Sequence, residues 1–435
     1  MAMVWQIGER HGRQLESGTV QIESSTFNLH SPCYAKGSMI ERTIRPVLEE
    51  LFQQYPVVTV TGPRQAGKTT LCREVFPNLE YINLERPDIR QRAIDDPRSF
   101  LDRYAEGAIF DEIQRAPELV SYLQVLIDER RRPGQFVLTG SQHFLIANTI
   151  SQSLAGRTGL LRLLPLSIEE VASAGANLET DTLLHTGFYP RLYDTPLEPT
   201  RAHGDYFETY VERDIRQLGE IRNLTAFQRF VRLCAGRTGQ LLNYSKLGND
   251  AGVSHATVRE WFSLLEASYV TFQLPPFHTN ISKRLIKTPK LYFYDVGLAA
   301  YLLGIEESAQ LFSHPMRGAL FENLVVVEAL KYRFNQGKRS NLFFYRDGKG
   351  DEVDLLYTLA NRFVSIEIKS GATLAQGFFR GLQRLRKFLP EHVAAEMLVH
   401  DGEGSHTQHG TRVTVPAEFV RELRELENLE LSGKG

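Results

Sequence analysis

The chain has 435 residues, of which 42% are hydrophobic, so it has enough apolar material for two or three cores and is expected to be multidomain. Its 50 Lys and Arg residues nearly balance its 52 Asp and Glu residues, and the formal net charge of -2 excludes any inference about partners from global charge. The three cysteines, Cys33, Cys72 and Cys234, are far apart and form no CxxC pair, which excludes a disulfide framework and a thiolate zinc site and fits a reducing cytoplasm.

The chain shows no sequence signal for export or membrane insertion. No stretch approaches the roughly 20 consecutive apolar residues of a membrane helix, and the N-terminus lacks the charged, apolar and small-residue order of a signal peptide. We therefore expect a cytoplasmic protein without a membrane partner. Residues 1–38 have no regular period and are interpreted either as a misassigned start or as a disordered extension, because an abrupt helical pattern begins only at Met39.

Short β-branched runs alternate with helical stretches over residues 57–164, which is typical of βα units that form a largely parallel sheet. The expected strands are Val57–Thr61, Glu80–Leu84, Ala108–Asp111, Gln135–Thr139 and Leu160–Leu164. Helices are expected to begin near Lys68, Pro97, Pro117 and His143. With the mainly helical stretch that follows, these features predict an α/β domain of the P-loop NTPase type, AAA-like, over residues 39–220.

The loop after the first expected strand matches G-x-x-x-x-G-K-[ST], in the strand-to-helix context that a phosphate-binding loop requires. Gly62 and Gly67 leave room for main-chain N–H groups around the β-phosphate of ATP, and the following helix adds a favourable dipole. We expect Lys68 to bridge the β- and γ-phosphates and Thr69 to ligate Mg²⁺. The residues predicted to bind ATP are Gly62, Pro63, Arg64, Gln65, Ala66, Gly67, Lys68, Thr69 and Thr70 of this loop, with Asp111 and Ser141 from later strands.

Asp111 and Glu112 directly follow the apolar run Ala108–Phe110. The carboxyl ends of parallel strands form the edge at which open α/β sheets bind ligands, so we expect both carboxylates beside the phosphate-binding loop. Asp111 is predicted to hold Mg²⁺ or its water, and Glu112 to orient and deprotonate the attacking water. The alternative for this pair is a helix N-cap followed by an acid in the first turn.

Weaker signals follow the next strand. Thr139, Ser141 and Gln142 are candidates for sensing the γ-phosphate, and Arg157 is a candidate for stabilising the transition state, either within one chain or across a subunit boundary. On chemistry alone, a capping serine or an ordinary surface arginine explains these residues equally well. An arginine supplied across a boundary would require a homo-oligomer, which the sequence leaves open.

Several of these strings together resemble the prokaryotic AAA-like ATPases that carry a C-terminal domain of the DUF4143 type. The strings are Thr61–Gln65, Ile109–Gln114, Leu138–Ser141, Leu154–Arg157 and Tyr210–Asp214, and the likeness covers about residues 40–400. The resemblance implies an AAA-type core, then a winged-helix segment, then a domain related to restriction endonucleases. It also supports a role for Arg157 and implies Arg213 as an interdomain or nucleotide-sensing candidate.

The segment 221–305 is predicted to be a winged helix-turn-helix unit, because a helix, a turn at Gly252 and a second helix over Ser254–Ala267 precede a pair of aromatic strands. Residues 221–294 hold ten Lys or Arg residues against three acids. The candidate wing is expected to contact DNA phosphates through Lys283, Arg284, Lys287 and Lys290. The alternative is a unit that only docks its neighbours and presents a solvated basic face.

Residues 306–435 are predicted to form an α/β domain like that of restriction endonucleases, from a helix over Phe321–Tyr332, two strands joined by a Gly-rich turn, a third strand and a further helix. The spacing of Asp354, Glu367 and Lys369 resembles the PD-(D/E)xK signature of nucleases, although Val353 replaces its proline.

Glu367 and Lys369 are two residues apart on one expected strand, so their side chains project from the same face. Beside Asp354 they form the carboxylate pair and ammonium that a Mg²⁺-dependent phosphodiesterase needs. Asp354 and Glu367, with Glu322 from the preceding helix, are predicted to bind the metal, and Lys369 to position or activate water. Cross-strand salt bridging is the ordinary alternative.

The sequence thus predicts ATP- and Mg²⁺-dependent hydrolysis coupled to a DNA-binding, nuclease-like C-terminal module. The predicted catalytic residues are Lys68, Glu112 and Arg157 for ATP, and Asp354, Glu367 and Lys369 for a phosphodiester. The alternative function is an ATP-dependent switch or scaffold whose C-terminal half binds DNA or a protein partner without cleaving it.

Overall fold

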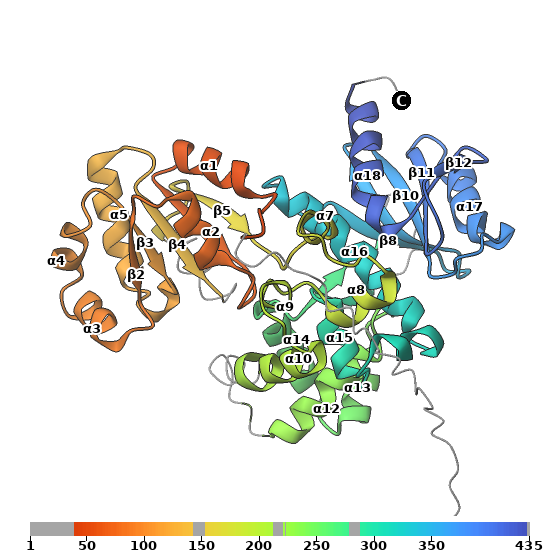
Figure 1. The fold of residues 1–435 in the computed structure, drawn as a ribbon, viewed down its shortest axis with the longest axis horizontal. Helices are drawn as coiled ribbons and strands as arrows, with labels where there is room; N and C mark the ends of the chain where they lie inside the picture. The colour runs from red at the N-terminus through yellow and green to blue at the C-terminus, as the bar shows by residue number, and fades with distance from the viewer. Residues whose placement is uncertain (1–38, 142–152, 212–220, 222, 278–287, 433–435) are drawn as a thin grey trace, which may run out of the picture. The chain divides into compact units, whose positions relative to one another are not determined.

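The computed structural model describes residues 39–141, 153–211, 221, 223–277 and 288–432, which all belong to one compact unit (Figure 1). Several predictions fall outside the described residues: the extension 1–38, the helix near His143, and the roles of Gln142, Arg213, Lys283, Arg284 and Lys287. None of the described helices is long and apolar enough to cross a lipid bilayer.

The first sheet has five parallel strands in the order β2-β3-β4-β1-β5. These strands are β1 (Val57–Thr61), β2 (Glu80–Asn83), β3 (Ala108–Asp111), β4 (Phe136–Gly140) and β5 (Thr158–Arg162). Every residue of β1, β3 and β4 is buried, as expected for central parallel strands that are covered on both faces. The predicted α/β class and parallel sheet are therefore confirmed.

Helices cover both faces of this sheet (Figure 1). On one face, α1 (Arg45–Gln54) and α2 (Lys68–Val75) bury Leu48 and Leu71 against Val60. On the other face, α3 (Pro87–Asp95), α4 (Pro97–Asp102) and α5 (Leu119–Arg130) surround Phe110 and Phe136, and the 3₁₀ helix η1 (Ile113–Arg115) follows β3. The sheet is thus closed on both sides, and its carboxyl edge is left to carry ligand-binding loops.

A helical segment follows β5 and ends in a short antiparallel strand pair. Its helices are α7 (Ile168–Ser173), α8 (Thr180–Thr186), α9 (Arg191–Asp194), α10 (Pro199–Tyr206), the π-helix η2 (Phe207–Val211), α12 (Leu224–Ala235), α13 (Tyr244–Ala251) and α14 (His255–Ala267). Strand β6 (Thr271–Leu274) pairs with β7 (Lys290–Phe293). The expected helix, turn and helix are present, because Gly252 ends α13 with a φ of 75° and Ser254 caps α14 by accepting from the Thr257 N–H.

The second sheet is mixed, with six strands in the order β12-β13-β11-β10-β9-β8. Its strands are β8 (Leu342–Arg346), β9 (Glu352–Leu359), β10 (Arg362–Lys369), β11 (Val393–His400), β12 (His406–Gln408) and β13 (Thr411–Thr414). The helices that accompany this sheet are α16 (Arg317–Asn335), η4 (Gln376–Phe379), α17 (Arg380–Phe388) and α18 (Pro416–Leu431). The two helices before α16, α15 (Val296–Leu302) and η3 (Ser308–Ser313), pack instead in the core of the helical segment. Strand β10 pairs antiparallel with β9, so Asp354 and Glu367 lie on neighbouring strands.

Helix α16 belongs to two hydrophobic cores at once. Leu320 and Leu324 pack in the core of the helical segment, whereas Phe321 and Val325 pack in the core of the second sheet. Every residue from Leu324 to Tyr332 is buried. A helix that is covered on all sides cannot be assigned to one neighbour alone, so the helical segment and the second sheet share it.

Candidate functional site

The loop between β1 and α2 depends on two glycines with left-handed backbone. Gly62 has a φ of 151°, and a Cβ there would lie 1.9 Å from the carbonyl oxygen of Leu163, so a side chain does not fit. Gly67 has a φ of 89° and caps α2. Because neither residue carries a side chain, the main chain of the loop stays accessible at the N-terminus of α2, where anions bind favourably.

Lys68 is buried beneath this loop. Its ammonium donates to the carbonyl oxygens of Gly62 (3.0 Å) and Pro63 (2.8 Å). Burial lowers the pKa of Lys68, and the carboxylates of Glu112 and Asp111 oppose that effect. The Lys68 side chain therefore lies inside the loop, in the position expected for a group that meets phosphate.

Asp111 accepts hydrogen bonds from three different elements at the carboxyl end of β3. Thr69 Oγ1 donates to its two carboxylate oxygens at 3.0 and 3.1 Å, and the Tyr81 hydroxyl donates at 2.7 Å. The Thr139 hydroxyl of β4 also donates to it. The structure thus brings the two predicted Mg²⁺ ligands, Thr69 and Asp111, side by side. This pair fits Mg²⁺, which takes few protein oxygens and completes its shell with phosphate and water.

Glu112 follows with an unusual backbone conformation, a φ of 56° in the left-handed region. Its N–H donates to Thr139 Oγ1 at 3.3 Å, and its carboxylate accepts from Ser141 Oγ at 3.2 Å and from the side-chain amide of Gln114. A non-glycine residue in this region is strained, and such strain persists where surrounding contacts hold it. These contacts aim the Glu112 carboxylate at the phosphate-binding loop.

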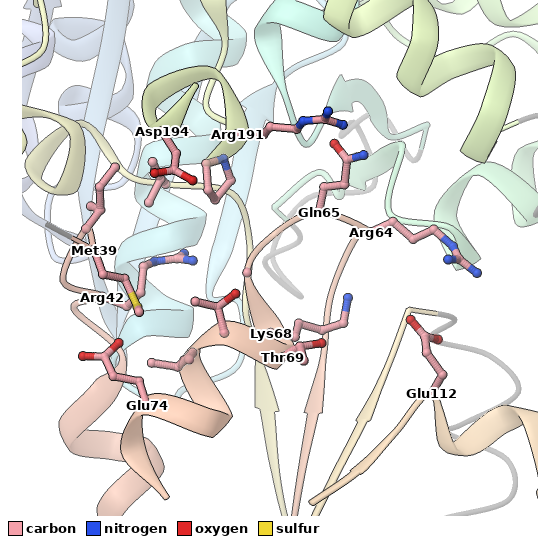
Figure 2. Close-up of a pocket in the computed structure, with 16 residues that line it drawn as sticks. Met39, Arg42, Arg64, Gln65, Lys68, Thr69, Glu74, Glu112, Arg191 and Asp194 are labelled. Atoms are coloured by element: carbon pink, nitrogen blue, oxygen red, sulfur yellow. The ribbon is translucent and has the colours of Figure 1, made fainter. Parts of the chain in front are cut away.

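A pocket of about 590 Å³ opens beside this loop (Figure 2). The predicted residues that line it are Arg64, Gln65, Gly67, Lys68, Thr69, Thr70 and Glu112. Asp111 adjoins it through its hydrogen bonds to Thr69, and Ser141 adjoins it through Glu112. Met39, Ile40, Leu166 and Pro190 add an apolar wall, of the kind that a nucleotide base requires.

The C-terminal residues singled out by their spacing also come together. Lys369 lies 3.2 Å from Asp354 and 2.7 Å from Glu367, and Asp354 accepts from the Ile368 N–H at 2.8 Å. Burial, with the repulsion of Asp354, raises the pKa of Glu367 to about 8. The predicted carboxylate pair and ammonium are therefore adjacent, and Lys369 contacts both carboxyl groups.

Glu322 behaves differently from its predicted role as a metal ligand. It forms an ion pair with Lys290 of β7 at 2.9 Å and accepts from the Tyr292 hydroxyl at 2.5 Å. In the part of the chain that the structure describes, no group of three or more His, Cys, Asp and Glu side chains is arranged to hold a metal ion. As placed, the acids of the second sheet do not fit a metal centre, because lysines occupy their oxygens.

Three family models match the chain in succession. Residues 54–172 match an AAA domain (AAA_14), residues 177–309 a domain of unknown function (DUF8612), and residues 317–420 a second domain of unknown function (DUF4143). The chain is 31% identical over 377 residues to the uncharacterized protein Rv2008c of Mycobacterium tuberculosis, covering 86% of this chain and 82% of the relative. The chain belongs to the family of AAA-domain proteins with a C-terminal DUF4143 domain.

The chain is also similar to two more distant proteins. An uncharacterized protein of Haemophilus influenzae is 23% identical over 357 residues, covering 72% of this chain and 82% of the relative. Among solved structures, the Walker-type ATPase PABY2304 of Pyrococcus abyssi is 16% identical with a TM-score of 0.41, covering 61% of this chain and 96% of that chain. The resemblance read from the sequence motifs is confirmed by the two family models at the ends of the chain.

In this AAA-domain protein, Arg157 lies at the far end of the sheet from the phosphate-binding loop. Its carbonyl oxygen accepts from the N–H of Val57, the first residue of β1, whereas the loop follows Thr61 at the other end. At roughly 3.3 Å per residue, β1 separates the two by about 13 Å. The guanidinium of Arg157 forms two hydrogen bonds with Asp128 of α5. The prediction that Arg157 acts on ATP within the same chain is therefore wrong. Its action across a subunit boundary stays a prediction.

Two residues of the AAA-domain pocket were missed in the sequence. Arg191, the first residue of α9, points toward the loop in Figure 2, and Asp194 lines the same pocket. Arg191 forms no ion pair with any residue that the structure describes. The break at Gly187–Pro190 marks the start of α9, but its distance from the loop in sequence hides its position beside the predicted ATP-binding residues.

Proposed function

We propose that this protein is a Mg²⁺-dependent ATPase whose reaction takes place in the pocket beside the phosphate-binding loop. The observation that carries the proposal is the contact between Thr69 and Asp111, which joins the loop to the acids after β3. Lys68, at the start of α2, and Glu112, directly after β3, line the same pocket. The AAA domain matched over residues 54–172 supports the proposal. We also propose that the protein acts in the cytoplasm, where ATP is available.

In the proposed mechanism, each residue acts on a different part of the reaction. Lys68 neutralises charge that develops on the β- and γ-phosphates. Thr69 and Asp111 would hold Mg²⁺, which when bound would supply further positive charge to the phosphate oxygens. Glu112 orients the attacking water and accepts its proton, while Ser141 fixes the Glu112 carboxylate.

Phosphate release from MgATP tests this proposal. We expect Lys68→Ala and Glu112→Gln to lose roughly 100-fold or more of the turnover, because each removes a group that acts in the transition state. Glu112→Gln should still bind a fluorescent ATP analogue, since it removes the base and not the loop. Lys338→Ala, at a half-exposed lysine, is the control and should match the wild type. Unchanged turnover in Lys68→Ala would contradict the proposal.

A basic groove on the helical segment favours a second function. The groove, of about 650 Å³, lies between α12 and α13 and contains Arg229, Arg232, Arg237 and Lys246. Arg237 pairs with Asp250, whereas the other three cations form no ion pair within the described ranges. We propose that this groove binds the phosphate backbone of DNA, and that residues 221–305 act as the winged helix-turn-helix unit.

Salt dependence distinguishes this binding from other modes of association. We expect the affinity for a DNA duplex to fall steeply with salt, and removal of each cation that meets a phosphate to reduce the slope of log K against log salt by about 1. The double variant Arg229→Glu, Arg232→Glu should lose most of the affinity. The charge-matched control is the double variant Arg86→Glu, Arg98→Glu, at two exposed arginines outside the groove. Equal loss in both variants would show that the groove is not the binding surface.

For residues 306–435 we propose a restriction-endonuclease-like fold that serves as the binding element of an ATP-dependent switch, and not as a working nuclease. The support is that Asp354, Glu367 and Glu322 are all paired with lysines. The domains 39–220, 221–305 and 306–435 are proposed as the three functional parts of this switch. Mg²⁺-dependent cleavage of plasmid DNA that disappears in Glu367→Ala would refute the proposal.

A further inference from the structure

Strand β7 inserts a lysine among the acids of the second sheet. Lys290, the first residue of β7, is 2% exposed. Its ammonium lies 2.9 Å from Glu322 of α16, 2.5 Å from Glu352 of β9 and 4.0 Å from Asp354 of β9. Three carboxylates from two separate elements therefore converge on one ammonium, which belongs to neither of them.

The surrounding side chains complete the charge pairing. Glu352 also pairs with Arg346 at 2.9 Å, and Lys369 bridges Asp354 and Glu367 on the far side of the cluster. Tyr292 projects from the same face of β7 as Lys290 and donates to Glu322. Each carboxylate of the cluster thus has a cation from the chain itself, which is the condition for keeping charges in a buried site.

Lys290 remains charged in this position. Burial lowers its pKa, but the carboxylates of Glu322, Asp354 and Glu352 outweigh burial, so the pKa of Lys290 is raised above its ordinary value. The ring of Phe344 covers the ammonium at 5.5 Å from its centroid and shields it from water. An apolar cover and three anions together make this a built cation site.

A divalent metal would need the same oxygens. Mg²⁺ requires carboxylate oxygens at about 2.0–2.1 Å in near-octahedral geometry. Glu322 and Glu352 instead hold the Lys290 ammonium between them at hydrogen-bonding distance. Metal and Lys290 cannot occupy the cluster together, so entry of a metal requires β7 to withdraw its lysine.

We propose that Lys290 is the resident cation of the acid cluster on α16 and β9, in the position that a divalent metal would otherwise take. The cluster then acts as a fastening between the helical segment, which supplies β7, and the second sheet. Metal binding and the docking of β7 are mutually exclusive. Lys290 and its carboxylates are far from the phosphate-binding loop in the chain, and their pairing does not depend on the proposed ATPase reaction.

Titration of the full-length, nucleotide-free chain with MnCl₂ tests the proposal, with free Mn²⁺ followed by electron paramagnetic resonance. We expect the wild type to show no saturable Mn²⁺ site below about 1 mM. Lys290→Met should gain one site per chain and bind at least roughly tenfold tighter than the wild type, because it exposes three carboxylates without their cation. The double variant Lys290→Met, Glu322→Gln should lose that site.

The matched control is Lys338→Met, which removes an exposed lysine near Glu427 and should resemble the wild type. A wild-type Mn²⁺ site that Glu322→Gln abolishes would overturn the proposal. A folded Lys290→Met chain without a Mn²⁺ site would overturn it as well. If Lys290→Met does not fold by circular dichroism, the wild type and Glu322→Gln still decide: Mn²⁺ binding that depends on Glu322 refutes the resident lysine, and its absence supports it.

Discussion

Arg42 donates a hydrogen bond at 2.7 Å to the carbonyl oxygen of Ala66, inside the phosphate-binding loop. The same guanidinium donates to the Leu164 carbonyl at 2.7 Å and lies 3.2 Å from Glu170. Glu170 in turn forms a capping box with Ser167 at the start of α7. One buried cation therefore ties the loop to the segment that leaves the first sheet after β5.

The second sheet reaches the same segment through α16. Lys331 donates to the Leu166 carbonyl at 2.7 Å, and Glu328 accepts from the Ile168 N–H at 2.9 Å. Lys331 and Glu328 are themselves an ion pair with almost no exposure. The segment 164–168 is thus held on one side by Arg42 and on the other by α16, which gives the loop a direct physical connection to the C-terminal half.

Arg42→Met is expected to destabilise the fold by about 3 kcal/mol, because it leaves the buried Glu170 without its cation. The variant should also bind ATP more weakly, since Ala66 loses a donor that fixes the loop. Urea unfolding and equilibrium binding of a fluorescent ATP analogue measure the two effects. Arg45→Met, at an exposed pair on α1, serves as the control and should leave both quantities unchanged. An Arg42 variant as stable as this control would contradict the prediction.

Tyr269→Phe is expected to cost about 1 kcal/mol of unfolding free energy. The buried Tyr269 hydroxyl donates at 2.9 Å to Thr61, the last residue of β1, and its loss removes a hydrogen bond between the helical segment and the strand that precedes the loop. Chemical denaturation of the two chains measures the difference. Tyr122→Phe, at an exposed tyrosine of α5, should be neutral; a Tyr269 variant that is equally neutral would show that the hydrogen bond adds nothing.

Arg191→Ala is expected to lower kcat for ATP at least roughly tenfold, because Arg191 lines the pocket of the phosphate-binding loop and a cation there would stabilise charge that develops on the phosphates. Arg157→Ala should leave kcat unchanged when the chain is monomeric, since Arg157 is at the far end of β1. Steady-state turnover at several protein concentrations separates action within one chain from action across a subunit boundary. A loss of activity in Arg157→Ala that grows as the chain associates would instead show that Arg157 acts across a subunit boundary.

The wild type is expected to lose stability as the pH rises from about 5 to 8, and Glu367→Gln should lessen that loss. In the unfolded chain Glu367 releases its proton near its ordinary pKa of about 4.5, whereas in the fold its pKa is raised to about 8. The folded state therefore binds more protons across this window, and stability falls with increasing pH. Relative to the wild type, Glu367→Gln should gain about 3 kcal/mol over the window. Urea unfolding at several pH values measures the effect, and parallel pH profiles would contradict it.

The parts of this protein that could be predicted from its sequence are those encoded by consecutive residues. The phosphate-binding loop is read directly because it needs glycine at 62 and 67, where the backbone is left-handed, and a lysine at the start of the next helix. The strands of the first sheet differ from their expected bounds by no more than two residues. The three strands that are buried throughout, β1, β3 and β4, differ by no more than one, because buried parallel strands are continuous apolar runs. The Gly252 turn and the Ser254 cap follow the same local rules.

The partner of each charged side chain was decided by the tertiary structure. The sequence pattern assigns Lys290 to a DNA-binding wing, yet this lysine is buried against Glu322. The same kind of pattern makes Arg157 a catalytic arginine, yet its strand begins at the opposite end of the sheet from the loop. Periodicity and motifs report which residues are buried and which loops bind phosphate, because those properties depend on neighbours in the chain. Which cation meets which carboxylate depends on how distant segments pack, and no local pattern records it.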